Sequence, residues 1–131
     1  MRVHILLRDE SSSKAIDFMC RAYGYETCVT TIESVQSYNR EDMYIVAETS
    51  RYAPDFADFR RLRETLRVDQ ENIIVLGAWN SIEIEARNHG VVNFIMLPEM
   101  AVTIVQVLRK RAQLDVHDRS DDHQVGTSSV A

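Results

Sequence analysis

The chain has 131 residues, of which 45% are hydrophobic and 27% charged, a composition typical of one soluble globular domain. Its net charge of −5 provides no basic face, so we expect no binding to nucleic acid. The sequence shows neither a signal-peptide pattern nor an apolar run near the roughly 18 to 20 residues that cross a bilayer, so we expect no membrane association. Cys20 and Cys28 are too few for a disulfide framework, and the expected location is the reducing cytoplasm.

The spacing of apolar residues predicts the secondary structure. In chain order we predict strands at residues 3–7, 25–32, 43–47, 72–78 and 91–97, helices near 11–23, 56–66, 82–88 and 100–113, and a short helix or irregular turn at 33–41. Ser11, Ser12 and Ser13 are candidate N-caps of the first helix, which Gly24 should end. Pro98 ends the last strand, because proline has no N–H to donate.

Strands and helices alternate in single file, which predicts an α/β fold of the (βα)5 type. In such a three-layer sandwich, helices cover both faces of a parallel five-stranded sheet. The residues after the first strand, Arg-Asp-Glu-Ser-Ser-Ser, contain no glycine, which argues against a Rossmann or Walker nucleotide site. We expect the domain to span residues 1–113 and residues 114–131 to form an acidic, disordered tail.

The C-terminal ends of parallel strands meet at one edge of the sheet, where α/β proteins build their sites. This rule brings together Arg8, Asp9, Glu10, Glu48, Gly77 and Leu97. Trp79 is expected either at the rim of this site or packed at the start of the fourth helix. His4 lies in the first strand without a partner at metal-ligand spacing, so we expect a structural histidine.

Residues 1 to about 113 resemble the receiver domains of response regulators, the CheY-like family. The resemblance rests on element order, length, the acidic residue after the first strand and the proline after the last. It implies a flavodoxin-like sheet with strand order 2-1-3-4-5. It also implies a phosphorylation site, in which an acidic pair binds Mg²⁺, an Asp accepts the phosphoryl group, and a Thr or Ser and a Lys complete the pocket. A nearby aromatic residue then switches rotamer.

This chain departs from the family's site residues almost throughout. In the best register Arg8 replaces the first acid and Asp9 keeps the second, while Glu48 takes the phosphoacceptor position, Gly77 the hydroxyl position and Leu97 the lysine position, and Phe94 keeps the switch aromatic. A register shifted by one residue would instead make Asp9 and Glu10 the acidic pair. Any metal would then be held by Asp9, Glu10 and Glu48, although we expect no metal and no other cofactor.

These replacements remove groups that phosphoryl transfer requires. The Glu48 side chain is one methylene longer than Asp, and a displacement of about 1 Å costs on the order of 100-fold in rate. Leu97 removes the ammonium group, and Arg8 places a permanent cation at the metal position. We expect Arg8 to bridge to Glu48 and Asp9. The alternative is that Arg8 extends into solvent and Glu48 is a hydrated surface acid.

The function predicted from these residues is that of a pseudo-receiver, a phosphorylation-independent regulatory module that binds a signalling or output protein and is not an enzyme. The family uses its fourth helix, fifth strand and fifth helix for partners, and this face also offers a homodimer surface. Its residues here are Ile84, Arg87, Val91, Met96, Val102 and Val105. One alternative is a divergent response regulator that still responds to Mg²⁺ and phosphodonor through Asp9, Glu10 and Glu48. The other is a small-ligand-binding or enzymatic flavodoxin-like domain.

Overall fold

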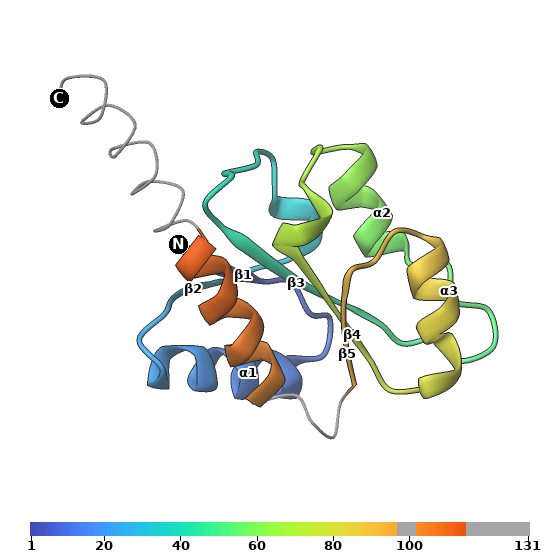
Figure 1. The fold of residues 1–131 in the computed structure, drawn as a ribbon, viewed down its shortest axis with the longest axis horizontal. Coiled ribbons are helices and arrows are strands. Elements are labelled where there is room, and N and C mark those ends of the chain that lie inside the picture. The colour runs from blue at the N-terminus through green and yellow to red at the C-terminus, as the bar shows by residue number, and fades with distance from the viewer. Residues whose placement is uncertain (97–101, 115–131) are drawn as a thin grey trace, which may run out of the picture.

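The computed structural model describes residues 1–96 and 102–114. Its centre is one parallel sheet in the order β2-β1-β3-β4-β5 (Figure 1). The strands are β1 (Arg2–Ile5), β2 (Glu26–Val29), β3 (Met43–Glu48), β4 (Ile73–Gly77) and β5 (Asn93–Met96). The predicted parallel sheet and its strand order are confirmed. All five residues of β4, which lies between β3 and β5, are buried, as expected for a strand that helices cover on both faces.

Helices lie on both faces of the sheet. They are α1 (Glu10–Ala22), α2 (Ala57–Glu64), α3 (Glu83–Asn88) and a C-terminal helix at residues 102–114. Figure 1 shows α1 and the C-terminal helix on one side, and α2 and α3 on the other. The core is divided accordingly: Cys20 and Ile104 belong to the cluster on the first face, whereas Leu62 and Ala86 belong to the cluster on the second.

For the segment between β2 and β3 the two predicted alternatives are a short helix and an irregular turn, and most of the segment is irregular. A short 3-10 helix, Ile32–Ser34, is followed by residues 35–41, none of which is helical. Ile32, Val35 and Tyr38 pack against the core of the α2 and α3 face and supply apolar cover. The Tyr44 hydroxyl accepts a hydrogen bond from the Asn39 N–H, so side chains also satisfy part of this backbone.

The first helix begins earlier than predicted. Asp9 is its N-cap, because its Oδ2 accepts a hydrogen bond from the Ser12 N–H at 2.9 Å, and the candidate serines lie inside the helix. At the other end Gly24, with φ of +89°, follows the cap residue Tyr23 as predicted. The earlier start leaves Arg8 as the only residue between Leu7 and the cap, at the end of the sheet.

Three further predictions concern His4, membrane-spanning helices and the C-terminal tail. His4 is a satisfied structural residue, with its Nε2 at 2.8 Å from Asp42 Oδ2 and its ring stacked on Tyr44. No helix within residues 1–96 or 102–114 has the length and apolarity needed to cross a membrane. The C-terminal helix reaches residue 114, and the expected disorder of the tail beyond it lies outside the described residues.

Candidate functional site

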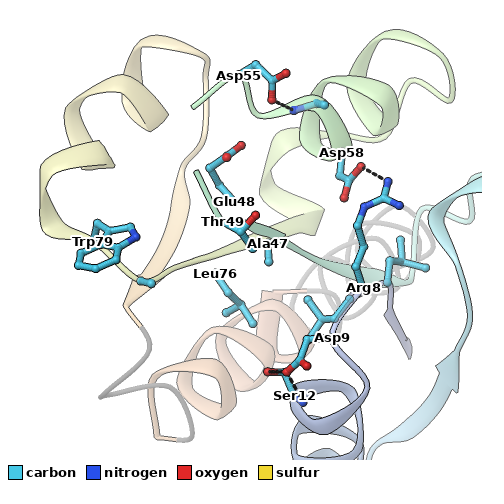
Figure 2. Close-up of a pocket in the computed structure, with 14 residues that line it drawn as sticks. Arg8, Asp9, Ser12, Ala47, Glu48, Thr49, Asp55, Asp58, Leu76 and Trp79 are labelled. Atoms are coloured by element: carbon cyan, nitrogen blue, oxygen red, sulfur yellow. Dashed lines mark hydrogen bonds and ion pairs between the residues drawn. The ribbon is translucent and has the colours of Figure 1, made fainter. Parts of the chain in front are cut away.

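A pocket of about 450 Å³ opens at the C-terminal edge of the sheet, where the sequence placed the site (Figure 2). Its apolar residues are Leu6, Leu7, Ala47, Ala57, Leu76 and Ala78, and its other lining residues are Arg8, Asp9, Ser12, Glu48, Thr49, Asp55, Asp58 and Trp79. The strand ends of β1, β3 and β4 therefore meet in one cavity. The predicted residues Arg8, Asp9 and Glu48 all line it, whereas Glu10 does not.

Glu48 is buried and holds the loop between β3 and α2. Only 7% of the residue is exposed. Its Oε1 accepts a hydrogen bond from the Ser50 N–H at 2.9 Å, and its Oε2 accepts one from the Phe56 N–H at 2.8 Å. Phe56 has a left-handed backbone, with φ of +51°, and its ring is buried. Both carboxylate oxygens of Glu48 are thus engaged in fixing this loop.

Arg8 pairs with two carboxylates other than the predicted ones. Its Nη2 lies 3.0 Å from Asp58 Oδ1 and 3.2 Å from Glu33 Oε1, and these contacts, first of all the hydrogen bond to Asp58, raise the pKa of Arg8. The predicted bridge from Arg8 to Glu48 and Asp9 is therefore wrong. Figure 2 shows the reason, since Glu48 points away from Arg8 and Asp9. Arg8 instead reaches outward, with 65% of its side chain exposed.

The two candidate acids after β1 have separate roles. Asp9 accepts hydrogen bonds from the hydroxyl and the N–H of Ser12, and these lower the pKa of Asp9. Glu10 pairs with Lys14 one turn along the exposed side of α1, with 3.1 Å between Oε1 and Nζ. Only Asp9 of these two residues lines the pocket. The shifted register, in which Asp9 and Glu10 form the acidic pair, therefore gains no support.

We expect the Asp9→Asn variant to lose the part of the pH dependence of stability that Asp9 contributes. The folded-state pKa of Asp9 lies below the unfolded value of about 3.9, so the stabilisation is complete above that value and is lost as the pH falls through the folded-state pKa. Asn caps a helix comparably but carries no charge. At neutral pH the thermal midpoint of the wild type should be a few degrees higher than that of the variant. The two midpoints should converge at strongly acidic pH. A constant difference across the range would contradict this assignment.

Phe94 fills the space that a side chain at position 77 would need. A Cβ added to Gly77 would lie 2.3 Å from Phe94 Cζ and 2.6 Å from Cε2, well inside van der Waals contact. The ring, which is half-buried, also packs against the core on the α2 and α3 face. The aromatic that the resemblance assigns to the switch position therefore lies over the strand end, in the place of the missing hydroxyl side chain. Leu97, the predicted substitute for lysine, lies outside the described residues.

The residues of this pocket do not fit Mg²⁺, the ion that the resemblance implies. Three features oppose it: both oxygens of Glu48 accept backbone hydrogen bonds, Asp9 caps a helix, and the guanidinium of Arg8 lines the same pocket. In the described part of the chain no three His, Cys, Asp or Glu side chains are grouped so that they could hold a metal.

The predicted partner surface is only partly exposed. Ile84 on α3 and Val102 on the C-terminal helix are 74% and 65% exposed, and Met96 is half-buried. Val91 and Val105 are buried, so the prediction that they contact a partner is wrong. Their apolar side chains contribute to the domain's own core. Arg87 donates hydrogen bonds to the carbonyls of Val91 and Val92, and thereby anchors the end of α3.

Sequence reasoning missed four polar residues at the site: Asp55, Asp58, Thr49 and the Arg8 partner Glu33. Asp58 was the most accessible to prediction, because a carboxylate in the first turn of the helix after β3 must lie above the C-terminal edge of the sheet. Glu33 gave no such signal, since it lies in the 3-10 turn of an irregular segment. Trp79 lines the pocket, in agreement with the first of its two predicted positions.

Comparison with protein-family models and with curated protein sequences finds no match. Solved structures do match. FixJ-N is 18% identical with a TM-score of 0.65, covering 86% of this chain and 93% of that one. The response regulatory domain of mrkE from Klebsiella pneumoniae is 13% identical with a TM-score of 0.64, covering 87% and 97%. A response regulator receiver domain from Clostridium thermocellum is 16% identical with a TM-score of 0.57, covering 87% and 99%. The chain therefore has the fold of the response-regulator receiver domains, the CheY-like fold.

Proposed function

We propose that this chain is a pseudo-receiver, a regulatory module with the receiver fold that acts without phosphorylation by binding a protein partner. The state of Glu48 carries the proposal. A phosphoacceptor carboxylate must offer an oxygen to the incoming phosphorus, whereas both oxygens of Glu48 accept hydrogen bonds from backbone N–H groups. These hydrogen bonds hold the carboxylate against the loop of residues 49–56, so a reaction at Glu48 would disturb that loop.

Two neighbouring features support the same proposal. The charge of Arg8 is paired with Asp58 and Glu33, so it is not available to balance negative charge developing on a phosphoryl group. At position 77 there is no hydroxyl to contact such a group, and Phe94 occupies the space where one would lie. The exposed side chains of Ile84 and Val102, on either side of β5, are the part of the predicted surface that remains for a protein partner or a second copy. A cytoplasmic location, and a role without nucleic acid or membrane, belong to the same proposal.

The test is an amide NMR spectrum recorded with Mg²⁺ and beryllofluoride, a mimic of the phosphoryl group. We expect the amides of Asp9, Glu48 and Gly77 to keep their shifts up to millimolar concentrations, because the pocket has no free carboxylate oxygen at Glu48 and no unpaired cation. Mg²⁺ alone is the control, since it separates weak cation binding from recognition of the phosphoryl mimic. Saturable shifts at these three amides, followed by shifts at Phe94 and α3, would support the divergent response regulator instead.

A further inference from the structure

The pocket at the strand ends is large enough for an organic molecule. Its volume of about 450 Å³ lies within the roughly 300 to 1,000 Å³ of small-molecule sites. Leucines at positions 6, 7 and 76 provide apolar contact surface, and the alanines at 47, 57 and 78 leave the space above them open. A cavity with this lining favours a compact apolar or aromatic body over a strongly hydrated ion.

The charges around the pocket favour a cationic ligand. Its lining contains the carboxylates of Asp9, Glu48, Asp55 and Asp58 and a single cation, Arg8. That cation is already paired with two carboxylates, so a phosphate or carboxylate ligand would meet no unpaired positive group in the lining. The hydrogen bonds from Ser12 lower the pKa of Asp9, which favours its negatively charged form.

Two of these acids are placed to bind a ligand. Both oxygens of Glu48 already accept backbone hydrogen bonds, and Asp9 caps α1. Asp55 Oδ1 accepts a hydrogen bond from the Ala57 N–H at 3.2 Å. Asp58 Oδ1 accepts one from Arg8 Nη2 at 3.0 Å. The second oxygen of each side chain accepts no hydrogen bond from the described residues. Figure 2 shows both side chains on the α2 side of the pocket.

An aromatic wall lies across the pocket from Arg8. Trp79 lines the cavity with 39% of its surface exposed, and Figure 2 places its indole on the side opposite the Arg8 guanidinium. The guanidinium carbon of Arg51, a residue that does not line the pocket, lies 4.5 Å from the centroid of the Trp79 ring in a cation–π contact. Because Arg51 does not line the pocket, the indole surface that does line it is left for contact with a flat ring.

We propose that this pocket binds a small aromatic amine, with the ring between Trp79 and the leucines and the ammonium group at Asp55 and Asp58. This inference deepens the proposed function and rests on it in one respect, namely that the pocket does not take a phosphoryl group. The amine would then be the signal that the module senses in place of phosphorylation. The loops that bind it carry Asp55 and Trp79 and lie next to β4 and α2.

The test compares three probes that share a phenyl ring and an ethylene linker: phenethylamine, 2-phenylethanol and 3-phenylpropionate. Trp79 is the only tryptophan of the chain, so its fluorescence reports on the pocket directly, and amide NMR locates the binding. We expect phenethylamine to bind about three- to five-fold more tightly than the alcohol, the ratio that one partly exposed ion pair supplies. We expect 3-phenylpropionate to bind most weakly. Equal binding of all three probes, a preference for the acid, or no binding at millimolar concentration would overturn the inference.

Two variants and a matched control make the assignment specific. Asp55→Asn should remove most of the preference for the amine over the alcohol. Glu64→Gln likewise removes one carboxylate, at the end of α2, but Glu64 pairs with Arg60 and does not line the pocket, so the preference should persist. Ala47→Leu should fill the floor and abolish binding of every probe, with circular dichroism confirming the fold. An unchanged preference in Asp55→Asn, or binding retained in Ala47→Leu, would overturn the assigned site. Beryllofluoride shifts in the separate NMR test would overturn the proposed function and, with it, the premise of this inference, whereas absent amine binding would overturn this inference only.

Discussion

Replacing Glu48 with alanine should lower the free energy of unfolding by about 3 kcal/mol, because hydrogen bonds to a charged group contribute about 1.5 to 3 kcal/mol each and a buried donor left without a partner is costly. The variant leaves the Phe56 N–H unpaired in a buried position and the Ser50 N–H in a partly buried one. Since water can reach the second group, the first should account for most of the loss. Urea denaturation with an unchanged slope measures the effect.

A graded series identifies the carboxylate as the cause. Glu48→Gln keeps the length of the side chain but replaces one acceptor oxygen by an NH₂ group, so it should lose about half as much stability as Glu48→Ala. Glu64→Ala, in an exposed pair on α2, is the control and should change stability by less than about 1 kcal/mol. Hydrogen exchange should accelerate first at Ser50 and Phe56. A loss below about 1 kcal/mol for Glu48→Ala would mean that the loop does not depend on this side chain.

The same residue shows where prediction from the sequence stops. The strands were predictable because apolar runs of four to six residues are buried in a parallel sheet, and the position of Glu48 at the end of β3 followed directly. The direction of its side chain did not follow. It depends on residues 49–56 folding back until the Phe56 N–H reaches Glu48. This requires a left-handed conformation at Phe56, which is not predictable because such positions are usually Gly or Asn.

Arg8 illustrates the same limit through its partners. The sequence correctly placed its Cα at the edge of the sheet, and the chemistry of guanidinium correctly predicted pairing with carboxylates. Which carboxylates it meets depended on the irregular segment that carries Glu33 and on the start of α2 at Ala57, which brings Asp58 within 3.0 Å. Element order fixes where strand ends meet, whereas loop conformation decides which side chains pair there. The predicted bridge failed at the second step.

Replacing Gly77 with alanine should lower the free energy of unfolding by about 2 kcal/mol, as overpacking a well-packed core typically does. The three atoms nearest to the added Cβ all belong to the Phe94 ring, at 2.3, 2.6 and 3.4 Å. The ring must therefore leave its place over the strand end and expose apolar surface to water. The backbone at Gly77 is outside the left-handed region, so alanine itself introduces no conformational strain. The Phe94 ring resonances in NMR spectra should report the displacement.

A double-mutant cycle with Phe94→Ala separates this clash from every other effect of the alanine. Once the ring is absent, Gly77→Ala should be neutral or should stabilise by about 0.5 kcal/mol, because alanine restricts the unfolded chain more than glycine does. The sign of the Gly77→Ala effect should thus reverse between the two backgrounds, with a coupling energy of about 2 kcal/mol. An equal loss in both would show that position 77 requires glycine for a reason unrelated to Phe94. A reversed sign would mean that the Phe94 ring can lie over the end of β4 only because position 77 carries no side chain.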